Sequence, residues 1–325
     1  MSIIDKPSDY FETKIYTGTG SELAITGVGF QPDWVWTKSR SNTLNHNVYD
    51  SVRGVNKGLK PNTADSEFND AQSLKSFNSD GFTVGTDSHI NTSSATFASW
   101  NWKETADAGF DIVSYTGNGS ARTLSHSLSA IPKMIIVKNL TSATSWHVYH
   151  NSIGATKYLQ LNSTNAEGTA SSVWNDTAPT SSVFSIGSGD GTNKNTDNII
   201  AYLFAEKQGY SKFGSYKGNG NADGSFIFTG QKSAFIMIKA ASRIGTWNMY
   251  DTKRNTFNNI QDFQIANVGE ADVTGNTYQN IDILSNGFKC YGTGTGTNEN
   301  GATYIYMAFA ENPFVTSSGV PACAR

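Results

Sequence analysis

The sequence has few of the residues on which several large classes of protein depend. It contains two cysteines, Cys290 and Cys323, which form neither a disulfide framework nor a zinc-ligand pattern. Charged residues make up only 16% of the chain and the net charge is -3, so no surface that neutralises nucleic-acid phosphates is expected. No apolar run approaches the roughly eighteen residues of a membrane helix, and the first residues lack the pattern of a signal peptide. We therefore expect no nucleic-acid partner, no membrane insertion and no export signal.

Internal repetition is the clearest feature that the sequence does have. The motif Tyr-x-Gly-x-Gly starts at Tyr16, Tyr115 and Tyr216, so it returns about every hundred residues. Four further landmarks follow it in the same order each time: a lysine that ends an apolar run, a tyrosine, a phenylalanine after a turn, and a glutamate that ends an aromatic run. These landmarks are Lys38, Lys138 and Lys239; Tyr49, Tyr149 and Tyr250; Phe82, Phe184 and Phe288; and Glu104, Glu206 and Glu311.

The repetition predicts three copies of one unit between a short head and a short tail. We assign the head to residues 1–8, copy 1 to 9–108, copy 2 to 109–209, copy 3 to 210–315 and the tail to 316–325. The period exceeds the roughly 20–50 residues of solenoid and propeller repeats and suits one small β-domain per copy. Equivalent faces of the copies could form either a body with approximate threefold symmetry or an extended row.

Apolar residues within each copy follow the pattern of β-strands. WVWTK, IIVK and FIMIK are short runs of β-branched, aromatic or other apolar residues, bounded by turn or polar residues. NIIAYLFAE and TYIYMAFAE are apolar on both faces, so we expect them inside a sheet. FNDAQSLKSF is the best candidate for a helical turn. The predicted fold is all-β, with three tandem repeats that are each an antiparallel β-sandwich, of which the jelly roll is one form.

The stretch YTGNGS at residues 115–120 could be a phosphate-binding loop or a simple turn. A phosphate loop places its glycines between a strand and the start of a helix. Strand-like residues flank this stretch on both sides, and no Walker lysine follows it. We therefore predict a hairpin turn in which glycine supplies a positive φ.

The recurring charged residues are candidates for a site. Two carboxylates held roughly 5–10 Å apart could hydrolyse a glycoside. However, Glu104, Glu206 and Glu311 end the same strand in each copy, which favours a solvated strand end or a shared ion pair. The three recurring lysines are interpreted as a common structural contact rather than as catalytic bases. We predict no catalytic residue and no enzyme activity.

The remaining candidates are ligands for metals and sugars. His147 and His150 lie three residues apart on a predicted strand, so they face opposite ways and do not suit a shared metal. Residues 189–197 carry oxygen-bearing side chains that could bind calcium, but their order is not that of an EF-hand and a polar hairpin loop is favoured. Trp174 lies in a polar, turn-rich segment and is the best exposed-aromatic candidate for ligand binding, although packing over the end of a sheet is favoured. No metal and no cofactor are expected.

Several motifs taken together resemble one family of bacteriophage proteins. They are YTGNG, GFQPDWVWTK, VYDSVRG, NSDGFTVG, WNDTAPTSSVFSIG and YIYMAFAENPF. The chain resembles, over about residues 9–315, virion proteins of marine phages and especially of cyanophages, which are labelled tail-fibre-like or structural and share a repeated domain of unknown function. The resemblance implies a virion protein that is assembled in the bacterial cytoplasm, binds other virion proteins and forms a homo-oligomer, by analogy a trimer. It supplies no catalytic residues.

Four functions remain open at this point. The leading one is a non-enzymatic component of the tail or tail fibre that attaches to a host-surface glycan, with weak sites strengthened by multivalency. The alternative is a capsid decoration or other structural virion protein with only protein partners. A polysaccharide depolymerase would require paired carboxylates in a groove. An extracellular bacterial lectin is disfavoured because no signal peptide is recognised.

Overall fold

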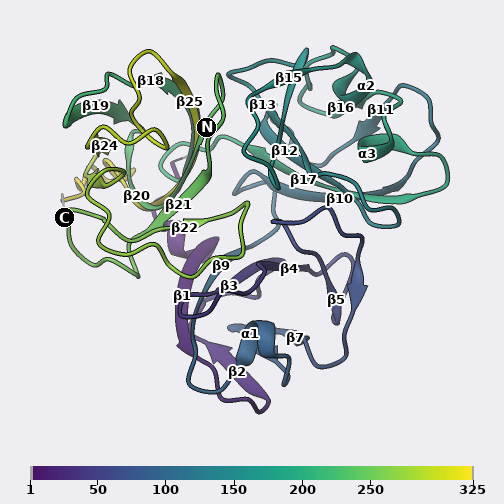
Figure 1. Ribbon diagram of the computed structural model, residues 1–325, viewed down its shortest axis with the longest axis horizontal. Helices are drawn as coiled ribbons and strands as arrows, with labels where there is room; N and C mark the ends of the chain where they lie inside the picture. Colours follow the sequence, from purple (N-terminus) through teal and green to yellow (C-terminus); the bar gives the residue numbers. More distant parts are fainter. Residues whose placement is uncertain (1–2, 324–325) are drawn as a thin grey trace.

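The computed structural model describes residues 3–323 and shows a body with three lobes (Figure 1). Copy 1 forms the lower lobe, copy 2 the upper right lobe and copy 3 the upper left lobe. Residues 1–2 of the predicted head and 324–325 of the predicted tail lie outside the described residues. Strands dominate every lobe, so the all-β prediction is confirmed. The helical segments of the described residues are short: η1 (Pro7–Asp9), α1 (Ser88–Asn91), α2 (Ser171–Trp174) and α3 (Asp190–Asn193).

Each copy has one larger antiparallel sheet, and the three sheets share the order of their first four strands. In copy 1 these are β1 (Phe11–Thr17), β9 (Thr96–Trp102), β3 (Trp34–Ser39) and β4 (Asn47–Asp50). In copy 2 they are β10 (Phe110–Thr116), β17 (Asn198–Ala205), β12 (Pro132–Asn139) and β13 (His147–His150), followed by β14 (Lys157–Gln160) and β15 (Gly168–Thr169). In copy 3 they are β18 (Ser211–Lys217), β25 (Thr303–Pro313), β20 (Gln231–Ala240) and β21 (Trp247–Asp251), followed by β22 (Gln264–Ile265). The closing strands β17 and β25 lie between two others, as their two apolar faces predict.

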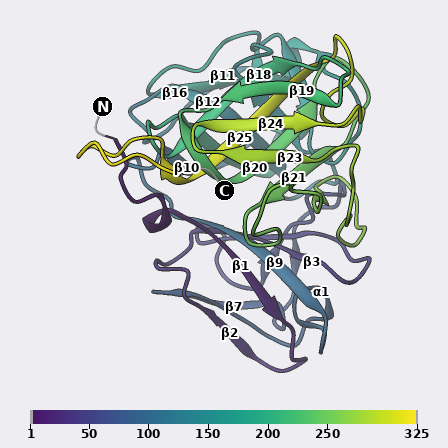
Figure 2. The same cartoon turned by 90° about the vertical axis from the view of Figure 1, so that its left-hand side faces the viewer.

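A smaller sheet covers the outer face of each larger sheet. The smaller sheets are β2 (Leu23–Thr26), β8 (Gly81–Val84) and β7 (Leu74–Asn78); β11 (Arg122–Ser125) and β16 (Val183–Ile186); and β19 (Asp223–Phe228), β24 (Gly287–Tyr291) and β23 (Ile281–Leu284). A further pair, β5 (Lys57–Gly58) and β6 (Phe68–Asn69), lies in copy 1. Figure 2 shows β24 and β23 in front of β20 and β25, and buried side chains of both layers pack in one cluster. Each copy is therefore sandwich-like.

The inner faces of the three larger sheets meet in one apolar core. Side chains at alternate positions of β9, β17 and β25 point into it, because successive residues of a strand face opposite ways. Aromatic rings touch across the copies: Trp34 lies 4.8 Å from Tyr202, and Phe11 lies 5.3 Å from Phe309, between ring centroids. The copies thus form a single body around a common centre rather than an extended row.

Two local predictions from the sequence are wrong. YTGNGS is no hairpin turn, because β10 pairs with β17 whereas β11 pairs with β16. The stretch therefore carries the chain from the larger sheet to the smaller one. FNDAQSLKSF forms no helical turn but contains β6 and the start of β7. Its weak helical pattern is overridden because Leu74 is buried where β7 pairs with β8.

Candidate functional site

An asparagine holds each glycine motif in place. In copy 2 the Asn193 Oδ1 accepts the N–H of Asn118 at 3.0 Å, and its Nδ2 donates to the carbonyls of Ser120 (2.6 Å) and Gly187 (2.8 Å). Gly119 adopts a φ of 71° and donates its N–H to the Asn193 carbonyl. Asn91 and Asn298 form the corresponding bonds in copies 1 and 3. These N–H groups are already paired, so the motif is a structural lock and not a phosphate loop.

The role of these three asparagines as locks of the turns was not predicted, although the sequence carries a signal for it. Each one lies five residues before the first residue of the closing strand of its copy: Asn91 before Thr96, Asn193 before Asn198 and Asn298 before Thr303. A side-chain amide that recurs at one offset, in a segment with no apolar pattern, is typical of a side chain that bonds to the backbone.

The recurring lysines contact backbone carbonyls at the junctions between copies. Lys138 Nζ donates to the Ala64 carbonyl of copy 1 at 3.0 Å, and Lys239 Nζ donates to the Thr164 carbonyl of copy 2 at 3.3 Å. Lys38 bonds within its own copy, to the carbonyl of Asn42 at 3.3 Å. Burial lowers the pKa of all three lysines to about 8. Their shared place agrees with a common structural contact.

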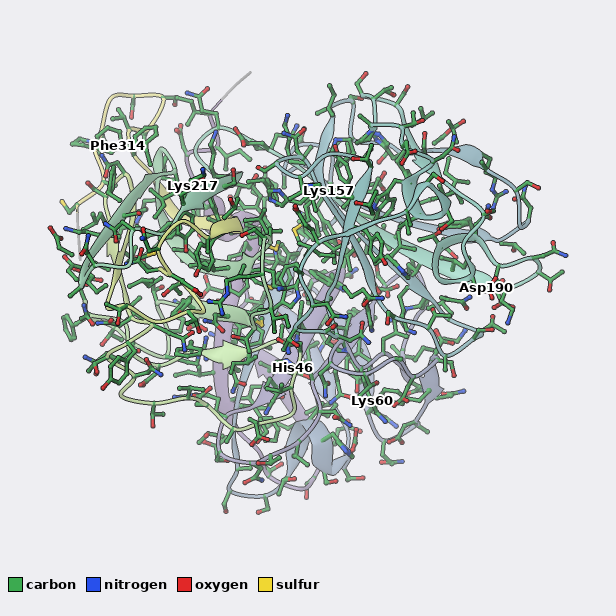
Figure 3. All side chains as sticks on the ribbon, turned by 45° about the horizontal axis from the view of Figure 1, so that its top comes forward. His46, Lys60, Lys157, Asp190, Lys217 and Phe314 are labelled. Atoms are coloured by element: carbon green, nitrogen blue, oxygen red, sulfur yellow. The ribbon has the colours of Figure 1, made fainter. Side chains whose placement is uncertain are left out.

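A ring of donors links the three copies in one direction. Trp146 Nε1 of copy 2 donates to the Lys60 carbonyl of copy 1 at 3.1 Å. Trp247 Nε1 of copy 3 donates to the Gln160 carbonyl of copy 2 at 3.0 Å. His46, which takes the place of these tryptophans in copy 1, donates through Nε2 to the carbonyl of Ile265 in copy 3 at 3.1 Å. Figure 3 shows His46 in the region where the copies meet. We call the contacts of copies 1 and 2, 2 and 3, and 3 and 1 the first, second and third junctions.

The recurring glutamates lie at the junctions, and their surroundings differ. Glu206 forms an ion pair with Lys212 at 2.7 Å, and Glu311 forms one with Lys232 at 3.4 Å. Glu104 instead faces the carboxylates of Asp111 and Asp33, and burial together with these neighbours raises its pKa to about 7. The predicted ion pair is therefore present in copies 2 and 3, whereas Glu104 forms none with the residues that the structure describes.

The arrangement at Glu104 is not that of a glycosidase. Its side chain shares a hydrogen bond with that of Asp111, so the two carboxyl groups lie closer than the roughly 5 Å that a retaining glycosidase needs. Among residues 3–323, no group of three or more His, Cys, Asp and Glu side chains is arranged to hold a metal ion.

The polar loop at residues 189–197 is not a hairpin loop. Asp190–Asn193 forms the helical turn α3, which closes the loop against the glycine motif. The carboxylate of Asp197 is used inside the fold, since it accepts from Asn139 Nδ2 at 2.8 Å and from Ser142 Oγ at 2.6 Å. Figure 3 shows Asp190 at the outer end of copy 2. The loop's side chains thus organise the turn.

The exposed-aromatic prediction for Trp174 is wrong. Its side chain is 1% exposed and packs edge-on against Tyr149, with ring centroids 6.0 Å apart. The reason is that the segment forms α2, whose apolar residues Val173 and Trp174 turn inward onto the core of copy 2. The favoured interpretation, a tryptophan that packs over a sheet, is correct. All seven tryptophans of the chain are fully buried, namely Trp34, Trp36, Trp100, Trp102, Trp146, Trp174 and Trp247.

Among the described residues, every exposed large aromatic side chain belongs to copy 3. They are Phe226, Phe228, Phe257, Tyr278 and Phe314. Phe226 and Phe228 flank the buried Ile227 on β19, so both point outward. The matching strands of copies 1 and 2 carry small or polar side chains on this face: Ala24 and Thr26 on β2, and Thr123 and Ser125 on β11.

A hollow of about 520 Å³ lies beside Phe228. It is formed where copies 2 and 3 meet the end of β25, and its lining includes Glu206, Lys207, Lys212, Phe228 and Phe314. Figure 3 shows Phe314 at the outer edge of copy 3, on the side opposite to Asp190. Hollows of this size with apolar walls and a few polar groups suit a small ligand. This hollow is the candidate functional site.

Comparison with known proteins identifies the family of this chain. No helix within residues 3–323 has both the length and the apolar character needed to cross a membrane. No match was found among the curated proteins. The family described as Domain of unknown function (DUF7483) matches residues 6–313, so that one match spans all three copies. A family unit of this extent agrees with the single core that the copies share, and the chain belongs to the DUF7483 family.

Proposed function

We propose that this chain is a non-enzymatic protein of a bacteriophage particle, a component of the tail or tail fibre that attaches to the host surface. The observation that supports attachment is the pair of outward phenylalanines, Phe226 and Phe228, on β19. The equivalent strands of copies 1 and 2 fold without them, so the fold does not need aromatic rings on this face. Aromatic side chains that are exposed beside a hollow and contribute little to folding mark an interaction surface.

The recurring polar residues have another use, which supports a non-enzymatic role. The three asparagines lock the turns. The side chains of Lys138, Lys239, Trp146, Trp247 and His46 join the copies. The repeated parts of the sequence therefore build a body. The parts in which copy 3 differs from the other copies supply the contact surface. The phage origin itself rests on the motifs described above.

Two measurements test this proposal. The chain is first sought in purified phage particles by mass spectrometry, and its absence from them would end the virion proposal. Purified protein is then added to host cells before the phage, and unadsorbed phage is counted. We expect dose-dependent protection, with other virion proteins as its partners in the particle and a homotrimer in light scattering. No protection by folded protein of known mass would favour a structural role among virion subunits, with Phe226 and Phe228 covered by a neighbouring subunit.

A further inference from the structure

The exposed wall of the hollow is aromatic. Phe228 is 58% exposed and Phe314 is 37% exposed, and both line the hollow. A flat apolar ring with polar groups beside it can pack on the C–H face of a sugar while those groups bond to its hydroxyls. Gln231 and the Thr229 to Gly230 turn also line the hollow next to Phe228. The Gln231 Nε2 and the Thr229 hydroxyl already donate to backbone carbonyls, so polar partners for a ligand come from the charged residues of the hollow.

The charged groups of the hollow carry an excess of positive charge. Its charged lining residues are Glu206, Lys207 and Lys212, so two ammonium groups face one carboxylate. Glu206 is paired with Lys212 at 2.7 Å. Lys207 forms no ion pair within residues 3–323. It also lines an adjoining hollow that carries Asp5, Asp9 and Asp107, so the excess of positive charge is confined to the side of Phe228. The chain as a whole has a net charge of -3, so a positive hollow is not a consequence of overall composition. Such a site favours an anionic ligand.

The other two junctions show that this combination is specific to the second junction. The residue after the recurring glutamate is Lys207 here, but Thr105 at the first junction and Asn312 at the third. The place of Lys212 on the first strand is taken by Asp111 and by Glu12. The place of Phe228 is taken by Ser125 and Thr26. The second junction alone therefore joins an aromatic ring to two cations, while the equivalent places of the other two junctions fold with neutral or acidic residues.

From these observations we infer that the hollow beside Phe228 binds an acidic sugar, a carboxylate-bearing hexose of a surface polysaccharide. This inference rests on the proposed attachment role and names its ligand and its site. The sugar ring packs on Phe228 and Phe314, and its carboxylate lies near Lys207. A volume of about 520 Å³ accommodates a ligand of this kind.

The test is a binding titration of the full chain with glucuronic acid, followed by NMR or calorimetry, with glucose as the neutral probe. We expect glucuronic acid to bind at least about tenfold more tightly than glucose. Phe228→Ser and Lys207→Thr introduce residues that copy 2 and copy 1 carry at these places, so both variants should fold. Each should weaken glucuronic acid binding by about tenfold or more. Phe257→Ser, at an exposed phenylalanine that does not line the hollow, should bind as the unaltered chain does.

Several outcomes would overturn the inference. Equal binding of glucose and glucuronic acid would remove the role of Lys207, and unchanged binding by Phe228→Ser would place the site elsewhere. Binding of a short poly-glutamate peptide at the hollow, with no binding of glucuronic acid, would assign it to a protein partner. Host-cell protection separates this inference from the attachment role. If the unaltered chain and the Phe228→Ser/Lys207→Thr variant protect cells equally, the site is wrong while attachment stands. If neither protects, attachment itself is wrong.

Discussion

The second junction joins its two copies with different side chains from those of the first and third junctions, although the backbone contacts are equivalent. At each junction one N–H donates to a carbonyl of the neighbouring copy: Glu67 to Leu140 (3.0 Å), Glu167 to Ala241 (2.8 Å) and Asp272 to Arg40 (2.8 Å). The apolar core also continues through all three. All three junctions thus share backbone hydrogen bonds and buried apolar side chains. Neither of these depends on particular charged residues.

The junctions differ in whether a buried Asp–Arg ion pair takes part in the contact between copies. Asp50 and Arg53 form a buried ion pair, and Asp50 also accepts the hydroxyl of Tyr202 across the first junction at 2.7 Å. Asp251 and Arg254 repeat this pair in copy 3, and there Asp251 accepts Trp100 Nε1 across the third junction. The matching residues in copy 2 are His150 and Ile153, and His150 donates to the Tyr306 carbonyl across the second junction at 3.1 Å. In copy 2 a neutral histidine makes the bond across the junction, so the ion pair is one of two arrangements that the fold accepts at this place.

The largest effect is expected from breaking one charged pair. Asp50→Ala leaves the Arg53 guanidinium, whose side chain is 3% exposed, with Glu67 as its remaining carboxylate partner. It also leaves the Tyr202 hydroxyl without its acceptor. We expect a loss of about 3–5 kcal/mol in the free energy of unfolding, measured by urea denaturation. The control is Asp50→His/Arg53→Ile, which installs the copy 2 residues and should cost clearly less. If it costs as much as Asp50→Ala, the junctions are not interchangeable.

Acid should weaken the second junction through His150. Its Nε2 donates to the Tyr306 carbonyl and its Nδ1 accepts the N–H of Ser152, so both nitrogens are used by the neutral ring. Burial lowers the pKa of His150 from 6.5 to about 4. The unfolded chain therefore binds a proton first, and stability is lost as the pH falls from about 6.5 to about 4, by on the order of 3 kcal/mol.

His150→Gln sharpens this comparison. The glutamine amide can still donate to the Tyr306 carbonyl, but it does not titrate. The unfolding free energy of the variant, measured across pH 4 to 6.5, should decline less steeply than that of the unaltered chain. His46 and His147 also have lowered pKa values because of burial, and they contribute equally to both proteins. Parallel declines would show that His150 does not carry this acid sensitivity.

The sequence predicts the strands better than it predicts how the copies meet. The run WVWTK, which is predicted as a strand, forms β3, and its alternate residues Trp34 and Trp36 lie in the central core. Nothing in the alternation tells which face meets a neighbouring copy and which meets the smaller sheet, because both faces are apolar in β17 and β25. The alignment of Trp146 and Trp247 with His46 holds a usable clue, since all three side chains carry a ring N–H.

A moderate effect is expected from removing one donor of the ring. Trp146→Phe keeps an aromatic side chain in the core but leaves the Lys60 carbonyl without the indole N–H. We expect a loss of about 0.5–1.5 kcal/mol in the free energy of unfolding, because the bond across the first junction is lost while the Lys60 carbonyl keeps the N–H of Thr63 at 3.1 Å. Trp174→Phe is the matched control, since the Trp174 Nε1 has no hydrogen-bond partner within the described residues. Equal losses in the two variants would mean that ring size matters and the bond across the first junction does not.

The smallest effect separates two glutamates at the same place in their copies. The pKa of Glu104 is raised from 4.5 to about 7, so the folded chain keeps a proton that the unfolded chain releases. Stability is therefore lost as the pH rises from about 4.5 to about 7, by on the order of 1 kcal/mol because the group is partly exposed. Glu104→Gln stays neutral and should become the more stable protein above pH 7. Glu206→Gln loses its ion pair with Lys212 and should instead be less stable by about 0.2–1 kcal/mol. The melting temperatures of both variants are measured at pH 8. A rise for Glu104→Gln and a fall for Glu206→Gln would confirm that the ionised carboxylate destabilises one copy and stabilises the next. The same sign in both variants would show that Asp111 and Lys212 do not set the difference.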